Sequence, residues 1–157
     1  SFLNKEWPIE KFEALTHRIV NELHFQVVLL GGLKEKKISQ EIAQKFTSNV
    51  LSVAGLFDLS QSAAVLNRSQ VTIANDTGML HLSEALNVPV VGIYGPTVRQ
   101  FGYFPILENS RVAQVELSCR PCTKMGMNNC PKGTFDCTKN ISVDMVFSYI
   151  KSIMHNK

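Results

Sequence analysis

The sequence lacks long apolar runs. None of its hydrophobic stretches approaches the roughly 18 residues that a membrane-spanning helix needs, and the stretch SFLNKEWPIEKF does not have the basic-then-apolar order of a signal peptide. Lys and Arg are scattered, and the net charge is only +3 with a pI of 8.7. We therefore expect a cytoplasmic protein, with no nucleic acid partner and at most peripheral membrane association.

Internal repeats and low-complexity segments are also absent. The chain has 157 residues, of which 45% are hydrophobic, which suffices for one core but not for two. We expect residues 1–157 to form a single domain. Cysteine is confined to one region, because all four cysteines fall between residues 119 and 137. A disulfide framework of a small secreted protein would be distributed more widely.

Hydrophobic periodicity predicts helices and strands in alternation. Apolar residues recur at helical spacing in 8–23, 38–46, 60–68, 77–87 and from a Ser142 N-cap onward. Strand-like runs occupy 25–32, 50–55, 70–75, 88–95 and 111–117, with 118–140 as loop. The runs FQVVLLGG and VPVVGIYG are typical of strands buried on both faces. This pattern predicts an α/β protein with a Rossmann-like, doubly wound parallel sheet.

The first predicted element is a helix, whereas a Rossmann-like domain normally begins with a strand. The chain is therefore interpreted as a piece of something longer.

Two short polar turns follow successive predicted strands, in NDTGMLHLSEALNVPVVGIYGPT at residues 75–97. Ligands of open parallel sheets bind beyond the carboxyl ends of the strands. There the N-terminus of a helix stabilises a phosphate without a metal ion. Gly78 would let a ligand approach the backbone, Thr77 adds a hydroxyl donor, and His81 lies one turn into the helix. The turns therefore predict one phosphate site.

Each of these residues also has a plainer interpretation. Asp76 could be only the N-cap of its helix, and His81 a half-buried histidine with a satisfied ring. Gly95-Pro96-Thr97 could be only a turn that ends a strand. The combination at consecutive strand ends favours the phosphate site over the separate explanations.

The pattern Asp76-x-Gly78-x-x-His81, Ala85, Pro89 and Gly95-Pro96-Thr97 resembles the signature of the lipopolysaccharide heptosyltransferases. These are bacterial inverting glycosyltransferases of the two-domain GT-B type. Three further stretches resemble family motifs: NKEWPIEKF, VVLLGGLKE and FGYFPILENSRVAQVELSCRPC. The resemblance implies the C-terminal half of a GT-B enzyme, which holds a nucleotide-sugar, usually ADP-heptose, and requires no catalytic cofactor.

The resemblance also implies roles for single residues. Lys5 would contact the diphosphate, Glu35 the ribose hydroxyls, with Glu41 as another carboxylate nearby, and Asp76 a sugar hydroxyl. His81 would contact the phosphate or the sugar and, with Lys5, stabilise the leaving group. By residue type alone, Lys5 would be an exposed surface lysine. The expected donor-binding set is Lys5, Glu35, Asp76, Thr77, Gly78, Met79, His81, Gly95, Pro96 and Thr97.

The acceptor half of the family pattern is missing. The N-terminal domain would hold the lipopolysaccharide inner-core acceptor and the catalytic carboxylate, at the inner face of the inner membrane. Nothing in this sequence matches a catalytic base. We expect the chain alone to bind donor but to transfer no sugar.

The cysteine cluster has three interpretations. Cys119 and Cys122 have the spacing of half a zinc site, but Cys130 and Cys137 are farther apart than is usual. A structural zinc, free thiols and two local disulfides all remain open. The surrounding loop is either a basic surface for an anionic acceptor or an ordinary solvated loop, and its basic residues are Arg120, Lys124, Lys132 and Lys139.

The sequence leaves two other functions open. One is a zinc-knuckle interaction module on a Rossmann-like scaffold. The other is half of a different nucleotide-sugar enzyme, such as an epimerase.

Overall fold

The first long helix begins directly after Pro8. The computed structural model describes residues 2–155 and places α1 at Ile9–Leu23 with Pro8 as its N-cap. Proline suits this position because the first amides of a helix have no intrahelical partner. His24 ends the helix in left-handed backbone with φ 57°. The predicted helix is confirmed, whereas the short 3-10 turn η1 (Leu3–Lys5) was not predicted.

The predicted alternation continues along the chain. All strand pairs among the described residues are parallel, as the alternation predicted. The elements after α1 are β1 (Val27–Leu29), α2 (Lys36–Ala43), β2 (Val50–Ser52), α3 (Leu59–Asn67), β3 (Thr72–Asn75), α4 (Gly78–Ala85) and β4 (Val90–Ile93). They are followed by η2 (Arg99–Phe101), β5 (Arg111–Ala113), α5 (Asp136–Lys139) and α6 (Val143–His155).

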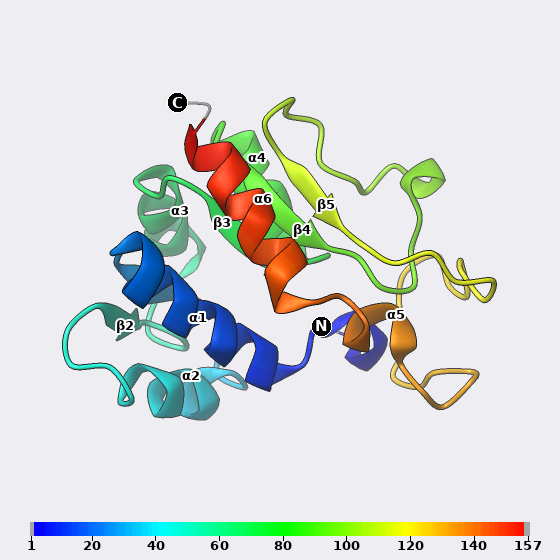
Figure 1. Ribbon diagram of the computed structural model, residues 1–157, viewed down its shortest axis with the longest axis horizontal. Helices are drawn as coiled ribbons and strands as arrows, with labels where there is room; N and C mark the ends of the chain where they lie inside the picture. The colour runs from blue at the N-terminus through cyan, green and yellow to red at the C-terminus, as the bar shows by residue number, and fades with distance from the viewer. Residues whose placement is uncertain (1, 156–157) are drawn as a thin grey trace.

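Helices cover both faces of the strands. In Figure 1, α6 crosses the near face of β3, β4 and β5, with α1 beside it, while α3 and α4 lie behind. The strands form two sheets, one with the order β1-β2 and one with the order β3-β4-β5. The α/β fold with parallel strands and two helical layers is thus confirmed, but the described strands do not form one continuous sheet.

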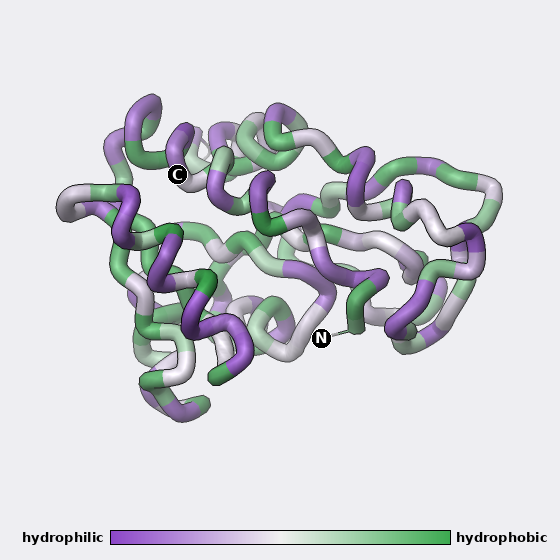
Figure 2. The backbone as a smooth tube through the Cα atoms, turned by 90° about the horizontal axis from the view of Figure 1, so that it is seen from below, coloured by the Kyte–Doolittle hydropathy of each residue, from purple (hydrophilic) through white to green (hydrophobic). Residues whose placement is uncertain are grey.

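The main core lies between the larger sheet and the two helices on its near face. Trp7, Leu15 and Ile19 meet Phe147 and Ile150 there. A smaller core on the other face contains Leu80, Val90, Tyr94 and Phe104. The tube in Figure 2 alternates between hydrophilic and hydrophobic along the helices, as expected for helices with one buried stripe. No helix within residues 2–155 is long and apolar enough to cross a membrane.

The strands are shorter than the apolar runs that predicted them. The residues that flank each strand belong to loops. Some of them still bond to each other, as where the Gly55 amide donates to the Gly31 carbonyl beyond the ends of β1 and β2. The prediction that both faces are buried is confirmed for β4 and wrong for β1. Val28 is 41% exposed and its partner Leu51 in β2 is 60% exposed. Apolar composition favours a strand, but exposure depends on what covers it.

The end of the chain differs from the prediction in one place. The segment 118–140 was predicted as loop throughout, yet it contains α5. A helix of four residues is too short to show a periodicity. The last helix begins as predicted, because the Met145 amide donates to the Ser142 hydroxyl at 3.1 Å.

Leu80 provides a test of the packing. Its side chain is 0% exposed in the smaller core, so Leu80→Ala should lower the free energy of unfolding by about 2–5 kcal/mol. Leu59→Ala is the matched control, because Leu59 is 68% exposed and its loss should change stability by less than about 0.5 kcal/mol. Urea denaturation measures both. Equal effects would contradict the packing described.

Candidate functional site

A hollow of about 180 Å³ opens beyond the carboxyl end of β3, and we call it the β3 hollow. Its lining comes from four parts of the chain: the turn η1, the start of α4, the loop after β4 and the loop after β5. The lining residues are Lys5, Asp76, Thr77, Gly78, His81, Tyr103 and Met125. The structure thus brings together the η1 lysine and the residues of the Asp-Thr-Gly turn.

Lys5 and Asp76 form an ion pair at one wall of the β3 hollow. The Lys5 Nζ lies 2.6 Å from the Asp76 Oδ2, and the side chains are 11% and 4% exposed. Lys5 also donates to the Asp76 carbonyl at 3.5 Å. The interpretation of Lys5 as an exposed surface lysine is therefore wrong. An ammonium group has three donor hydrogens, so one remains for a ligand in the hollow.

Asp76 is held from a second side by the strand-end turn after β4. The Thr97 hydroxyl donates to the Asp76 Oδ2 at 3.1 Å, and Thr97 is fully buried. The interpretation of Asp76 as a helix N-cap is wrong, since Thr77 occupies that position. The Asp76 Oδ2 therefore contacts both Lys5 and Thr97, while its Oδ1 faces His81.

The N-terminus of α4 has no side-chain cap. Thr77 has extended backbone and makes no capping hydrogen bond with its side chain. A Cβ atom added at Gly78 would meet nothing within 4 Å, so the space over this residue is open. Uncapped amides with open space before them are suited to receive an anion.

His81 lies one turn into α4 and faces the same hollow. Its side chain is 46% exposed, and its Nε2 lies 3.8 Å from the Asp76 Oδ1. The ring is about half buried, so this exposure fits the plainer interpretation of a half-buried histidine as well as a ligand contact. The ring is accessible from the β3 hollow and has a carboxylate oxygen nearby.

The remaining predicted residues of α4 and the β4 turn do not line the β3 hollow. Gly95, Pro96 and Thr97 are buried, and Met79 is partly buried. A Cβ atom at Gly95 would lie 2.9 Å from the Asn4 carbonyl oxygen and 2.5 Å from the Thr138 Cγ2. Gly95 is therefore needed for close packing behind the site.

Glu35 lies elsewhere, on the exposed loop after β1. Its Oε2 accepts a hydrogen bond from the Gly32 amide at 2.8 Å, and it does not line the β3 hollow. Glu41 lies farther along α2, with its carboxylate 3.9 Å from the Lys37 ammonium. The loop of Glu35 does follow the carboxyl end of a parallel strand, as does the Asp-Thr-Gly turn.

Two lining residues were not predicted from the sequence. Tyr103 follows η2, and its hydroxyl lies 3.3 Å from the Met125 sulfur. Its carbonyl accepts a hydrogen bond from the buried Tyr94 hydroxyl, which links it to β4. Both residues lie in irregular segments, where hydrophobic periodicity carries no signal. The one feature of the sequence that could have indicated Tyr103 as a site residue is that it is an aromatic residue in the loop after the Gly95-Pro96-Thr97 turn.

The cysteine-rich loop packs against the N-terminal segment. The Asn4 amide donates to the Met127 carbonyl at 3.2 Å, and the Met127 amide donates to the Asn4 Oδ1 at 2.9 Å. Arg120 donates to the Thr97 carbonyl at 2.8 Å and to Gln114 at 2.9 Å. Burial lowers the pKa of Arg120. Its side chain joins the loop to the turn after β4 through these hydrogen bonds, so Arg120 is not part of a solvated basic surface.

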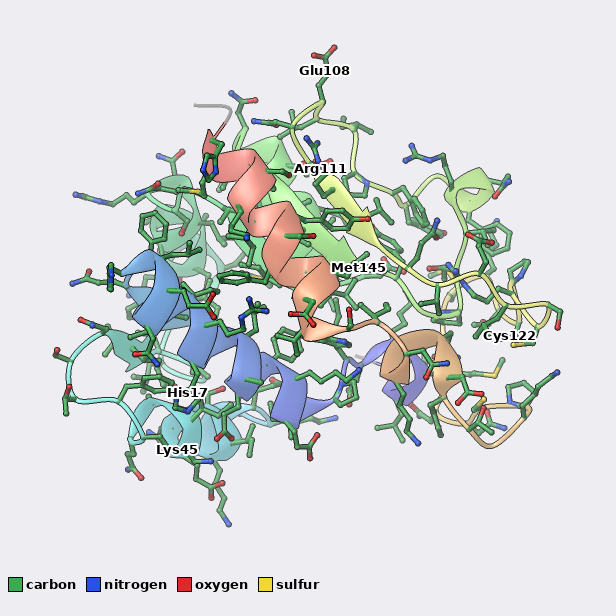
Figure 3. The ribbon with its side chains drawn as sticks, viewed as in Figure 1. His17, Lys45, Glu108, Arg111, Cys122 and Met145 are labelled. Carbon is green, nitrogen blue, oxygen red and sulfur yellow. The ribbon has the colours of Figure 1, made fainter. Side chains whose placement is uncertain are left out.

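The four cysteines are free thiols. Burial raises the pKa of Cys137 and Cys122, whereas backbone amides of 132–135 directed at the Cys130 sulfur lower its pKa. Figure 3 shows Cys122 in the loop beside α5, at the opposite end of the molecule from Lys45. Within residues 2–155 no group of three or more His, Cys, Asp or Glu side chains is arranged to hold a metal ion. The structure thus gives no support to a zinc site or to a zinc-knuckle module.

A larger hollow of about 440 Å³ lies away from these residues. It is an open groove around the loop before β5, and its lining includes Arg99, Ile106, Arg111 and Tyr149. It contains none of the predicted donor-binding residues. The smaller β3 hollow is the better candidate, since a helix N-terminus and a buried ion pair converge on it.

The chain is similar to several known proteins. A lipopolysaccharide heptosyltransferase 2 of Salmonella typhimurium is 30% identical over 115 residues, which are 71% of this chain and 32% of that protein. A glycosyltransferase family 9 structure from Veillonella parvula superposes with a TM-score of 0.81 and 25% identity, covering 98% of this chain and 43% of its own. An E. coli heptosyltransferase solved with ADP superposes with a TM-score of 0.71 at 22% identity, over 96% of this chain and 40% of its own.

The chain thus spans between about a third and a half of the proteins it resembles. The model of one family matches residues 1–132, which include all the residues that line the β3 hollow. The chain belongs to glycosyltransferase family 9, the heptosyltransferases.

Proposed function

We propose that this chain is the donor-binding half of a heptosyltransferase of lipopolysaccharide core synthesis, and that the β3 hollow receives the diphosphate of a nucleotide-sugar such as ADP-heptose. One observation carries the proposal: the uncapped N-terminus of α4 and the Lys5 ammonium meet at one hollow. Family membership and the ADP held by a structural neighbour support the ligand class. No metal ion is needed, because the helix N-terminus and Lys5 supply the positive charge.

The chemistry follows from the leaving group. When the bond from the sugar to the diphosphate breaks, negative charge grows on the diphosphate while the sugar becomes oxocarbenium-like. Lys5, the α4 amides and His81 would face that charge, and a preorganised donor of this kind is worth about 3 kcal/mol of transition-state stabilisation. The Asp76 Oδ1, which faces the nearby His81 ring, would accept a hydrogen bond from a sugar hydroxyl.

The nucleoside would extend from the β3 hollow toward the loops after β1 and β2. Like the Asp-Thr-Gly turn, those loops follow the carboxyl ends of parallel strands, where ligands of such sheets bind. Glu35 would meet the ribose hydroxyls there. Exposed apolar side chains of the same loops, Leu33 and Leu56, would lie beside the base. The acceptor and the catalytic base belong to a second domain in this proposal.

Donor binding is tested by titrating the isotopically labelled chain with ADP and following backbone amides by NMR. We expect the largest shifts at Thr77 and Gly78, because these amides begin α4 at the β3 hollow. UDP and GDP are the controls and should give weaker shifts. Equal responses to all three, or shifts confined to the groove near Arg111, would contradict the proposed site.

The role of Lys5 needs a variant that preserves the fold. Lys5→Met alone would leave the buried Asp76 carboxylate unpaired, at a cost of about 3–5 kcal/mol. In the double variant Lys5→Met/Asp76→Asn, the amide oxygen still accepts from Thr97 and no charge is stranded. Its affinity for ADP should fall roughly 10- to 100-fold, since a hydrogen bond to a charged group is worth about 1.5–3 kcal/mol.

Calorimetry measures this affinity, with Lys37→Met as the control because the Lys37 side chain is 91% exposed. ADP lacks the heptose whose hydroxyl Asp76 would bind, so the loss of that contact does not affect the comparison. A double variant that unfolds at the same temperature and binds ADP as tightly as the parent would exclude Lys5 from the site.

The 157-residue chain by itself should transfer no heptose. In the proposal the acceptor site and the catalytic base lie in the other domain, so the donor alone would meet no nucleophile. Incubation with ADP-heptose and a lipid A-Kdo acceptor, followed by mass spectrometry of the lipid, checks this expectation. A lipid gaining one heptose would show that the chain holds a complete active site.

A further inference from the structure

The lining of the β3 hollow has a charged part and an uncharged part. The charged part contains the Lys5 ammonium, the His81 ring and the uncapped start of α4. The uncharged part consists of Tyr103 and Met125, and we call these two residues the neutral wall. Phosphates are stabilised beside a cation and a helix N-terminus, whereas a neutral group gains nothing from them. A ligand with a diphosphate and a neutral sugar would therefore place its sugar against the neutral wall.

The order of the strands favours the same orientation. Tyr103 lies in the loop after β4, and Met125 lies in the loop after β5. In Figure 1, β2 lies to one side of β3, while β4 and β5 lie to its other side. In the proposed function the nucleoside extends toward the loops after β1 and β2. The sugar, at the other end of the diphosphate, would then extend toward the neutral wall.

The backbone at Tyr103 is held by the smaller core. Its carbonyl accepts a hydrogen bond from the hydroxyl of Tyr94, whose side chain is 0% exposed. The next residue, Phe104, packs against the Tyr94 ring with 4.2 Å between the ring centroids. The preceding residue, Gly102, has a φ of 82°, which residues with a side chain rarely adopt. A side chain on a fixed backbone is suited to bind a ligand in one defined orientation.

The Tyr103 hydroxyl has only a weak partner in the Met125 sulfur. The two atoms are 3.3 Å apart, and a thioether is a poor hydrogen-bond acceptor. Exchanging this contact for a sugar hydroxyl would therefore give a stronger hydrogen bond. Met125 is 57% exposed, and its unbranched side chain can adjust to a ligand. The tyrosine ring also offers an apolar face to the C–H groups of a sugar.

We propose that Tyr103 is a specificity-determining residue for the sugar of the donor: its hydroxyl hydrogen-bonds a sugar hydroxyl, and its ring packs against the sugar. Met125 borders the same subsite from the cysteine-rich loop. The ligand of this subsite is a neutral sugar with several hydroxyl groups, attached to the diphosphate. The inference rests on the proposed function, because it assigns the part of the β3 hollow next to the diphosphate.

The variant Tyr103→Phe tests the proposal, because it removes the hydroxyl and keeps the ring. Calorimetry compares the affinities of the parent chain and the variant for ADP and for ADP-heptose. The affinity for ADP-heptose should fall roughly 3- to 10-fold, as expected for the loss of one hydrogen bond between uncharged groups, while the affinity for ADP stays the same. Tyr149→Phe is the matched control and should change neither affinity, because Tyr149 lies on α6 and lines the other groove.

The two ligands separate the ways in which the proposal can fail. If Tyr103→Phe changes neither affinity, the hydroxyl does not contact the sugar. If both affinities fall by the same factor, Tyr103 acts on the diphosphate or on the fold and does not recognise the sugar. Either result would overturn the inference and leave the proposed function standing. A parent chain that binds neither ligand would overturn both.

The methionine methyl groups give an independent readout by NMR of the chain with isotopically labelled methionine. ADP-heptose should shift the Met125 signal clearly more than ADP does, because only the sugar reaches this side chain. Met145 is the control: it lies on α6 and does not line the β3 hollow, so its signal should respond to neither ligand (Figure 3). Equal shifts of the Met125 signal with the two ligands would contradict the placement of the sugar.

Discussion

The ion pair between Lys5 and Asp76 is the contact on which the site depends. It joins residues that are 71 positions apart and fixes the approach to α1 at the carboxyl end of β3. Two charges removed from water are stable only when each is paired and its remaining positions are hydrogen-bonded. Thr97 and the Asp76 carbonyl supply those bonds. The pair thus holds a cation beside the uncapped start of α4, where neither element alone would provide a defined anion site.

A second set of contacts extends from this pair into irregular structure. Arg120 bonds the carbonyl of Thr97, and Asn4 exchanges two hydrogen bonds with Met127. A segment with little regular structure is therefore tied on two sides, to the β4 turn and to the turn of Lys5. This explains how Met125 and Tyr103 come to form the far wall of the β3 hollow. The cysteine-rich segment is part of the site's support.

Helices and strands were predictable because burial imposes a period on the sequence. The periods of α1, α6 and the apolar run of β4 correspond to elements that are buried as expected. The prediction failed where exposure depends on a neighbour, as at Val28, or where an element is too short for a period, as in α5. Tyr103 and Met125 lie in loops whose positions depend on contacts with remote residues, so no local pattern indicated them.

The sequence by itself determined the alternation of the longer helices with the strands, their parallel pairing and the place of the Asp-Thr-Gly turn at a strand end, because these follow from local periodicity and turn chemistry. Only the tertiary structure decided that Lys5 is buried against Asp76, that Arg120 is an internal tie, and that the described strands divide into two sheets. The physical reason is that the burial of a charge and the pairing of a strand edge are set by the groups that surround them. Those groups come from distant parts of the chain, and a local sequence pattern does not indicate which of them will lie close together.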